Sequence, residues 1–422
     1  MKRIISFWLL IGLGYGSAFA QISLEECREK AHENYPLIKK YGLIEQTKEY
    51  NLSNAKKAYL PQFQLNARAT YQSEVTGLPI SLPGVTIPEV KKDQYQATVE
   101  ASQLLWDGGG IRAQQKMTQA NAEVEKKQLE VELYAIEDRV NQLFFGILLF
   151  DAQLEQNRVM AGELERNRQT IAVYMENGIA NQSDLDAVRV EQLRVKQTRT
   201  QLQVTRSAYL EMLAIMTGEK FSDDISLIKP TQPVIAGLTR NPLSRPELQL
   251  FTAQADLFDS QKDLIKSSYM PKLGLYLQGG YGRPGLNMLS DAFEPFYIGG
   301  IRLTWNFGAL YTQKNDLRKI ETNKNTVDMQ RDLFLYNIRL TESRENKDIQ
   351  RIRELMKDDD EIISLRESIR KSAEAKMANG TLTVTDLLQE ISREDMARQT
   401  KAAHEIDLLL AIYNSLWVRG TR

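Results

Sequence analysis

Strict alternation of apolar and polar residues marks four short stretches of the chain. From Gln62 to Gln72 every odd position carries an apolar residue or tyrosine, and every even position is polar. A period of two predicts a strand with one apolar and one polar face. The predicted strands span residues of about 61–73, 93–106, 271–282 and 296–307. Each is close to the roughly 9–11 residues that a tilted strand needs to cross a bilayer.

Two kinds of sheet produce such alternation. A soluble antiparallel sheet has one dry and one wet face, whereas a membrane barrel has a lipid face and a water-filled lumen. The polar faces here carry Gln, Asn, Thr and Arg, which favours the barrel. We therefore expect Leu65 and Leu275 to face lipid, and Gln64 and Gln278 to face the lumen.

Two very long helices follow the strand pairs. From Gly110 to about Glu176 the chain contains no proline, and its apolar residues step by alternating fours and threes. This heptad pattern is typical of helices that supercoil against neighbours. A matching helix is predicted from about Tyr311 to Ala378. Each would have roughly 65–70 residues and a length of about 100 Å. The apolar run "LFFGILLF" is too short to span a membrane and predicts a packed seam.

The chain contains one structural unit twice. "AYLPQFQL" is echoed by "SYMPKLGL", and "LLWDGG" by "LTWNFG", in the same order. Such internal similarity predicts a repeated helix–strand–strand–long helix–helix unit. We place the first repeat at residues 21–217, a linker at 218–241 and the second repeat at 242–422.

A shared phrase ends both long helices. "MENGIANQSDLDA" and "MANGTLTVTDLLQ" each place Asn-Gly where the helical pattern stops. A few residues later each has an aspartate three positions after a polar residue, as Asn181-x-x-Asp184 and Thr383-x-x-Asp386. Glycine is favoured at the left-handed end of a helix, and the polar residues resemble a capping box that opens the next one. We therefore predict tight helix hairpins with tips at about 177–184 and 379–386. Ile179 and Leu382 are expected to be exposed there, which would suit contact with a partner.

Four strands cannot close a barrel, since the smallest membrane barrels have about eight. An open sheet edge is not tolerated in lipid because its backbone groups have no hydrogen-bond partners. If the strands cross a membrane, the protein must therefore be an oligomer. Two copies would supply eight strands and three would supply twelve.

The remaining features restrict location and chemistry. Residues 1–20 combine a basic start, an apolar stretch and an Ala-Phe-Ala end, which predicts an exported protein with a cleaved signal peptide. The net charge of −1 gives no reason to expect nucleic acid as a partner. His32 and His404 lie far apart and are interpreted as surface residues, and Cys27 as a small apolar residue. The acidic run "KDDDE" at 357–361 is interpreted as a solvated face. We expect no catalysis, cofactor or metal.

The duplicated unit, the "YLP" and "YMP" strand starts, the glycines after Trp106 and Trp305 and the paired Asn-Gly hairpins together resemble the TolC-like outer-membrane efflux protein family. The resemblance covers essentially the whole mature chain. It implies a homotrimer with a twelve-stranded β-barrel in the outer membrane and a long periplasmic α-helical barrel. It also implies a passive exit duct of a tripartite efflux or type I secretion system. Drugs, metal ions, oligosaccharides and proteins all fit as cargo.

The resemblance also implies site residues. The periplasmic entrance would be constricted by an aperture, for which Asp386 matches the first acidic position, Gln389 stands at the second, and Asp184 is the equivalent residue of the first hairpin. A periplasmic adaptor, coupled to an inner-membrane pump, would contact the tips. The tip residues are Asn177, Gly178, Ile179, Asn379, Gly380, Thr381 and Leu382. Segment 218–241 and the short tail after Trp417 would form a small equatorial collar.

A second class of protein fits part of the pattern. A periplasmic coiled-coil scaffold could carry the four strands as a soluble cap and have no transmembrane pore. The two classes differ in whether the apolar strand faces meet lipid.

Overall fold

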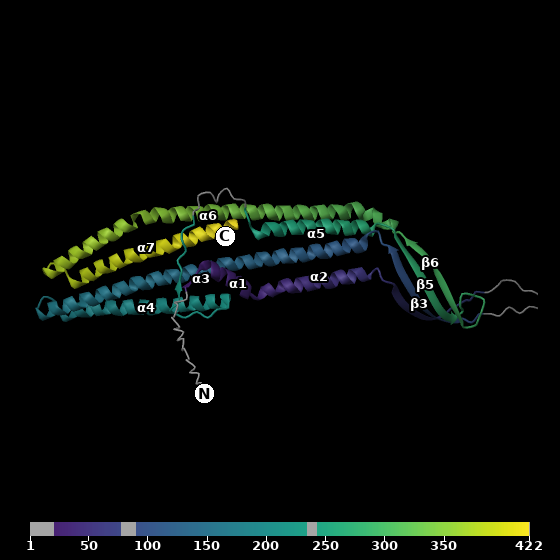
Figure 1. The fold of residues 1–422 in the computed structure, drawn as a ribbon, viewed down its shortest axis with the longest axis horizontal. Coiled ribbons are helices and arrows are strands. Elements are labelled where there is room, and N and C mark those ends of the chain that lie inside the picture. Colours follow the sequence, from purple (N-terminus) through teal and green to yellow (C-terminus); the bar gives the residue numbers. More distant parts are fainter. Residues whose placement is uncertain (1–20, 77–89, 234–242, 422) are drawn as a thin grey trace, which may run out of the picture. The chain divides into compact units, whose positions relative to one another are not determined.

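The computed structural model describes residues 21–76, 90–233 and 243–421 (Figure 1). The predicted signal peptide, 1–20, and the end of the predicted collar segment, 234–241, lie outside the described residues. Within the described part, the chain is mainly helical and has two very long helices, each preceded by a pair of strands. The predicted fold class of the chain is therefore confirmed.

The two halves contain corresponding elements. The first half consists of β1 (Gln21–Ile22), α1 (Leu24–Asn34), the 3₁₀ helix η1 (Pro36–Lys39), α2 (Lys40–Lys57), β2 (Gln62–Tyr71), β3 (Asp93–Trp106), α3 (Gly110–Glu176) and α4 (Gln182–Thr217). The second consists of β4 (Ser226–Leu227), α5 (Pro246–Ser268), β5 (Lys272–Arg283), β6 (Glu294–Thr304), the 3₁₀ helix η3 (Phe307–Ala309), α6 (Leu310–Ala378) and α7 (Val384–Arg419). The long helices have 67 and 69 residues, and each is followed by one of 36.

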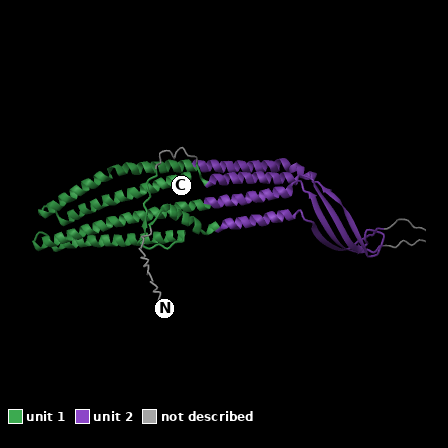
Figure 2. Cartoon of the chain, in the orientation of Figure 1, with its two compact units in different colours: residues 1–38, 132–245, 337–422 green, residues 39–131, 246–336 purple. Residues whose placement is uncertain are grey.

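Two compact units divide the chain, and each draws on both repeats (Figure 2). Unit 1 comprises residues 1–38, 132–245 and 337–422, and contains both helix hairpins. Unit 2 comprises residues 39–131 and 246–336, and contains the four long strands. The two repeats therefore follow one another along the chain, whereas each compact unit contains corresponding segments of both repeats.

The four long strands form one antiparallel sheet in the order β2-β3-β5-β6. Leu65 lies opposite Val99, and Gln64 lies opposite Glu100, which in turn lies opposite Gln278. Paired residues share a face of the sheet, so the alternation read from the sequence produces one mainly apolar and one mainly polar surface. Among the residues that the structure describes, β2 and β6 are the edges of this sheet and have no further strand beside them.

One strand differs from its expected bounds by more than two residues. β6 runs from Glu294 to Thr304, whereas the sequence pattern predicts about 296–307. The Trp305 indole donates to the Tyr269 carbonyl at 3.0 Å, and a 3₁₀ turn begins at Phe307. The apolar alternation continues through Trp305, but this side-chain bond turns the chain away from the ladder before the pattern ends.

Within unit 1, a short parallel pair joins the start of the described chain to the predicted linker. Gln21 and Ile22 of β1 pair with Ser226 and Leu227 of β4. Arg206 of α4 holds the linker by donating to two of its backbone carbonyls, those of Asp223 at 2.6 Å and Ile225 at 2.8 Å.

α3 and α4 pack as one hairpin in unit 1 (Figure 1). Phe144, Phe145 and Ile147 of the "LFFGILLF" run are almost fully buried, which agrees with a packed seam. Gly146 allows the ring of Tyr209 on α4 to approach closely, because a Cβ atom on Gly146 would lie 2.6 Å from the Tyr209 Cε1 atom. Among the helices that the structure describes, none combines the length and apolar character needed to cross a membrane.

Replacing Gly146 should therefore have an effect opposite to the usual one. Alanine normally stabilises a helix interior by about 0.5–1 kcal/mol relative to glycine, but Gly146→Ala should lower the thermal midpoint because the methyl group collides with Tyr209. Gly162→Ala is the matched control, since its Cβ would meet only the end of the Arg166 side chain, at 3.9 Å. It should raise the midpoint. Equal stabilisation by both substitutions would show that the α3–α4 contact at Gly146 is loose.

Candidate functional site: two helix-hairpin tips

The first tip ends α3 with a left-handed glycine. Gly178 has φ 75°, and its N–H donates to the Met175 carbonyl at 3.1 Å. The Ile179 N–H reaches back to the Tyr174 carbonyl at 2.8 Å. These two bonds are those of a Schellman motif, which satisfies carbonyls left unpaired at a helix end. The Asn177 side chain adds a third by donating to the Val173 carbonyl at 2.8 Å.

The second tip repeats this chemistry at α6. Gly380 has φ 69°, and its N–H donates to Met377 at 2.9 Å. The Thr381 N–H and hydroxyl both donate to the Lys376 carbonyl, each at 2.9 Å. Asn379 donates through its side chain to Ala375 at 2.8 Å. The predicted helix ends are therefore present, and at both glycines a Cβ atom would meet nothing within 4 Å. The glycines are required for conformation alone.

The two following helices are capped differently. Asn181 and Asp184 form a full capping box, in which each side chain accepts from the other residue's backbone N–H, at 3.2 and 3.0 Å. At the second tip the Thr383 hydroxyl accepts from the Asp386 N–H at 3.2 Å, but the Asp386 carboxylate accepts from that hydroxyl at 2.6 Å instead of from the backbone. The capping-box prediction is thus complete for the first hairpin only.

The tip residues also differ in exposure. Asp386 and Gln389 are exposed, Asp184 is half-buried, and the Ile179 side chain is 54% exposed. Leu382 is half-buried and packs on a core formed by both hairpins. The expectation that Leu382 is exposed was therefore wrong, because its position on the turn places it against that core, as the corresponding position places Ala180 in the first turn.

A shared apolar core brings the two tips together. It contains residues of α3, α4, α6 and α7, and Ile171, Val188, Leu387 and Ile391 are almost fully buried in it. Ala180 and Leu382 pack against it from the two turns. Because one core supports both tips, neither hairpin end is positioned independently of the other.

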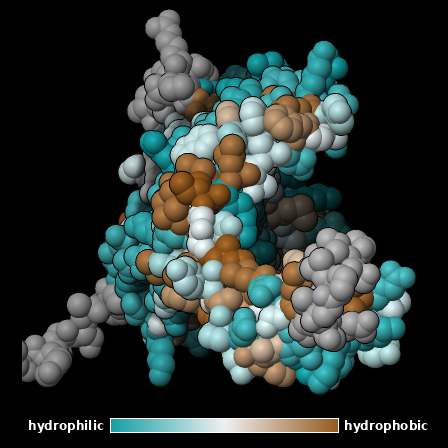
Figure 3. Space-filling model, turned by 90° about the vertical axis from the view of Figure 1, so that its right-hand side faces the viewer, coloured by the Kyte–Doolittle hydropathy of each residue, from teal (hydrophilic) through white to brown (hydrophobic). Residues whose placement is uncertain are grey.

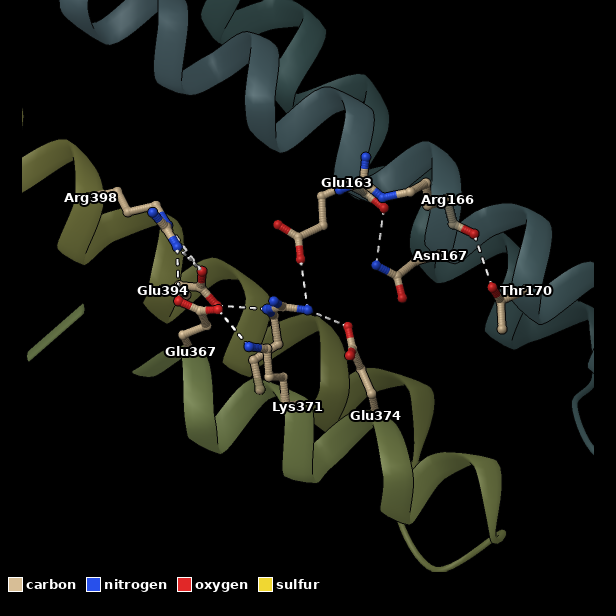
Figure 4. Close-up of polar contacts among 10 residues, drawn as sticks. Glu163, Arg166, Asn167, Thr170, Glu367, Lys371, Glu374, Glu394 and Arg398 are labelled. Atoms are coloured by element: carbon tan, nitrogen blue, oxygen red, sulfur yellow. Dashed lines mark hydrogen bonds and ion pairs between the residues drawn. The ribbon is translucent and has the colours of Figure 1, made fainter. Parts of the chain in front are cut away.

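A buried ionic network adjoins this core. Arg370 of α6 lies 3.1 Å from Glu163 of α3 and 2.6 Å from Glu394 of α7, and also pairs with Glu374 (Figure 4). Arg398 pairs with Glu394 at 2.7 Å. Arg370 therefore connects three helices and both hairpins. Buried ion pairs of this kind fix a geometry, and removing one partner costs more than the pair contributes.

Carboxylates near this network are shifted toward the protonated form. Burial raises the pKa of Asp395 to about 6, with the neighbouring charges of Glu163 and Glu394 acting in the same direction and the Gln399 hydrogen bond against it. Burial also raises the pKa of Glu163, although the positive charge of Arg370 opposes that shift. Both shifts therefore come mainly from burial, and the nearby arginines offset them only in part.

Sequence reasoning did not identify the Arg370 network. A signal was present, since Arg370, Ala373 and Met377 are spaced by three and four residues, as are Leu387, Ile391 and Glu394. Two charged residues thus occupy positions of an apolar helix face, which indicates a buried pair rather than a solvated surface.

Two further interpretations need correction. His404 is not a plain surface residue, because its Nδ1 atom lies 2.8 Å from a carboxylate oxygen of Asp359, which is buried. The "KDDDE" run is therefore only partly solvated, since Asp359 faces α7. Groups of three or more residues able to hold a metal ion do not occur among the described residues.

Comparison with known proteins identifies the fold. No protein-family model and no curated protein matches the sequence. Solved structures of outer-membrane channels do match. The OprN channel superposes with a TM-score of 0.68 at 14% identity, covering 94% of this chain and 90% of that one. VceC of Vibrio cholerae gives 0.65 at 15%, covering 93% and 95%. Neisseria gonorrhoeae MtrE, in its open state, gives 0.65 at 11%, covering 94% and 89%. The chain therefore has the TolC-like outer-membrane channel fold.

The pKa of Asp395 makes stability depend on pH. The folded protein binds this proton more tightly than the unfolded chain, in which the pKa is near 3.8, so stability falls as pH rises from about 4 to about 6. Asp395→Asn should raise the thermal midpoint at pH 7 and leave it unchanged at pH 4. The exposed Asp358→Asn should alter neither value. An equal effect of Asp395→Asn at both pH values would mean that Asp395 is not protonated in the folded state at pH 4.

Proposed function

We propose that this protein is the outer-membrane exit duct of a tripartite efflux or type I secretion system, a passive conduit without catalysis of its own. The observation that carries the proposal is the four-stranded sheet with one apolar face and two unpaired edges. The likeness to outer-membrane channels supports it, although identities of 11–15% establish only the fold.

The exposed apolar face of the sheet supports a lipid environment. Phe63 and Leu65 on β2 are 74% and 73% exposed, and Leu277 and Ile301 continue this face on β5 and β6. Apolar side chains form patches in the view of Figure 3. Aromatic residues lie at both ends of the strands, a pattern typical of membrane barrels. They are Tyr71, Tyr95 and Tyr281 at one end and Trp106, Trp305 and Phe307 at the other.

The free edges require more than one copy. Unpaired N–H and C=O groups of β2 and β6 are costly in lipid, and pairing β6 of one copy with β2 of the next satisfies both edges. Three copies would give a twelve-stranded barrel. Unit 1 supports association, because α4 and α6 each carry exposed apolar residues. On α4 these are Val190, Leu193, Val204, Met212 and Ile215, and on α6 they are Leu340, Leu355, Ile362, Leu365 and Ile369.

The tips are proposed to face the periplasm and to meet an adaptor protein coupled to an inner-membrane pump. Ile179 supports this assignment, since an exposed aliphatic side chain on a tight turn stabilises nothing within the chain. The other proposed contact residues are also exposed, and they are Asn177 and Gly178 in the first tip and Asn379, Gly380 and Thr381 in the second. Leu382 supports the tip from within instead of contacting the partner directly.

Substitutions on the two sheet faces test the membrane assignment. Arginine on the lipid face of a barrel costs about 2–4 kcal/mol at the midplane, whereas a lumen position tolerates it. Leu65→Arg should therefore reduce the heat-resistant trimer in the outer membrane, and Gln64→Arg should leave it at wild-type level. Cross-linking and heat-modifiable migration in detergent measure both. Equal tolerance, with a monodisperse monomer, would favour the periplasmic scaffold.

Substitutions at the tips test the adaptor contact. Ile179→Asp should abolish adaptor co-purification and export while trimer yield and heat resistance stay unchanged, because the side chain makes no core contact. Gly380→Arg should also abolish adaptor capture, since the space around its Cβ is open, but the positive φ of Gly380 strains any side chain there. If this variant fails to accumulate, Gly380 serves mainly to end the helix. Leu382→Asp is the contrasting variant and should lower trimer stability. Normal adaptor capture by the Ile179 variant would remove that residue from the proposed interface.

Single-channel conductance tests the aperture. Three copies of Asp386 around one axis would attract cations, and salt screens such an effect over about 8 Å at physiological strength. Asp386→Asn should reduce cation preference and weaken block by divalent ions, whereas Asp184→Asn should do so less because that carboxylate is bonded within its capping box. If neither substitution changes selectivity or block, Asp386 serves only as a helix cap, worth roughly 0.3–1 kcal/mol.

A further inference from the structure

The α6–α7 hairpin is held by two separate apolar cores. One joins Ile349 and Ile352 of α6 to Leu408, Ile412 and other residues of α7. The other is the tip core, to which α6 contributes Ala373 and Met377. Between these cores, residues 357–371 of α6 face 394–407 of α7. In this interval α6 and α7 are joined by ionic contacts.

Charged contacts replace apolar packing in the interval. Asp359 pairs with His404, Asp360 with Lys401, and Arg370 with Glu394. Of the apolar residues of α6 here, Ile362 and Leu365 are 46% and 57% exposed, whereas Ile363 is half-buried. Ionic contacts therefore contribute to the association of the two helices in this interval, and ionic contacts depend on pH.

Imidazole changes charge between about pH 5 and 8, and His404 supplies the imidazole of this interval. Its side chain is 18% exposed and that of Asp359 is 7% exposed, so water screens the pair poorly. We propose that His404 and Asp359 form a pH-sensitive link between α6 and α7, which tightens when the imidazole gains a proton and loosens when it loses one.

The direction follows from the cost of burying Asp359. A buried carboxylate is stabilised more by an imidazolium than by a neutral imidazole, because hydrogen bonds between charged groups are roughly twice as strong. The positive charge of Lys401 also acts on Asp359 and competes with the imidazolium for it, whereas the carboxylates of Asp360 and Glu405 have lysine partners of their own. Lys401 pairs with Asp360, and Glu405 pairs with Lys229 at 2.9 Å. Asp407, one turn along α7, attracts the imidazolium charge as well.

Hydrogen exchange of the full-length protein in detergent tests the link. In the wild type, amides of residues 357–362 and 401–407 should exchange about tenfold more slowly at pH 6 than at pH 8, after correction for intrinsic rates, because a bond between charged partners is worth about 1.4 kcal/mol more than one with a neutral partner. His404→Gln should remove this difference. His32→Gln, which changes the other histidine of the chain, should preserve it.

Asp359→Asn provides a second measurement and should also abolish the pH dependence. Asp395, whose pKa is raised to about 6, lies in the same stretch of α7 but outside residues 401–407, and the His404 variant leaves it in place, so a difference caused by Asp395 would persist in that variant. A wild-type protein without the difference, or a difference that persists undiminished in the His404 variant, would overturn the proposal. The readout is local to one hairpin and does not depend on whether the chain forms a duct, so it can fail independently of the proposed function.

Discussion

The unpaired backbone edges of β2 and β6 constrain everything else in this structure. Four antiparallel strands bury no common core, since both faces of the sheet remain open within one chain. Such a sheet is stable only where its edges are paired and its apolar face is removed from water. Both requirements are met together if copies of the chain join edge to edge in a membrane. The apolar residues exposed along α4 and α6 are consistent with the same association.

The helical part combines two kinds of contact with different consequences. Apolar cores, such as the one that contains Ile171, Leu387 and Ile391, hold the hairpins by close packing and depend little on solution conditions. Ionic contacts at Arg370 and His404 occupy the intervals beside these cores. Their strength depends on protonation and on exact geometry. In such a hairpin the apolar cores keep the two helices packed together, while the strength of the ionic contacts between them changes with pH.

The sequence predicted the features that depend on local periodicity. Strand faces follow from a period of two, the long α3 from a heptad, and the left-handed Gly178 and Gly380 from cap chemistry, since each is set by neighbours within about four residues. The buried pairs were not predicted, because Glu163 and Arg370 are more than 200 positions apart and only the fold shows that they meet. Likewise, the alternation through Trp305 indicated a longer β6, but a bond to the distant Tyr269 carbonyl ends the strand.

The two hairpin tips have the same turn but different residues exposed on it. Both turns have a glycine with positive φ and the same backbone bonds, so the duplicated sequence specifies the turn itself. The residue that follows is free to differ, and packing decides its environment. Ile179 projects from the first turn, whereas Leu382, one position later in the second, reaches the common core. Ala180, which corresponds to Leu382, packs on the same core from the first turn. The position just before the core-facing residue is therefore exposed in both turns, and it carries Ile179 in the first and Thr381 in the second.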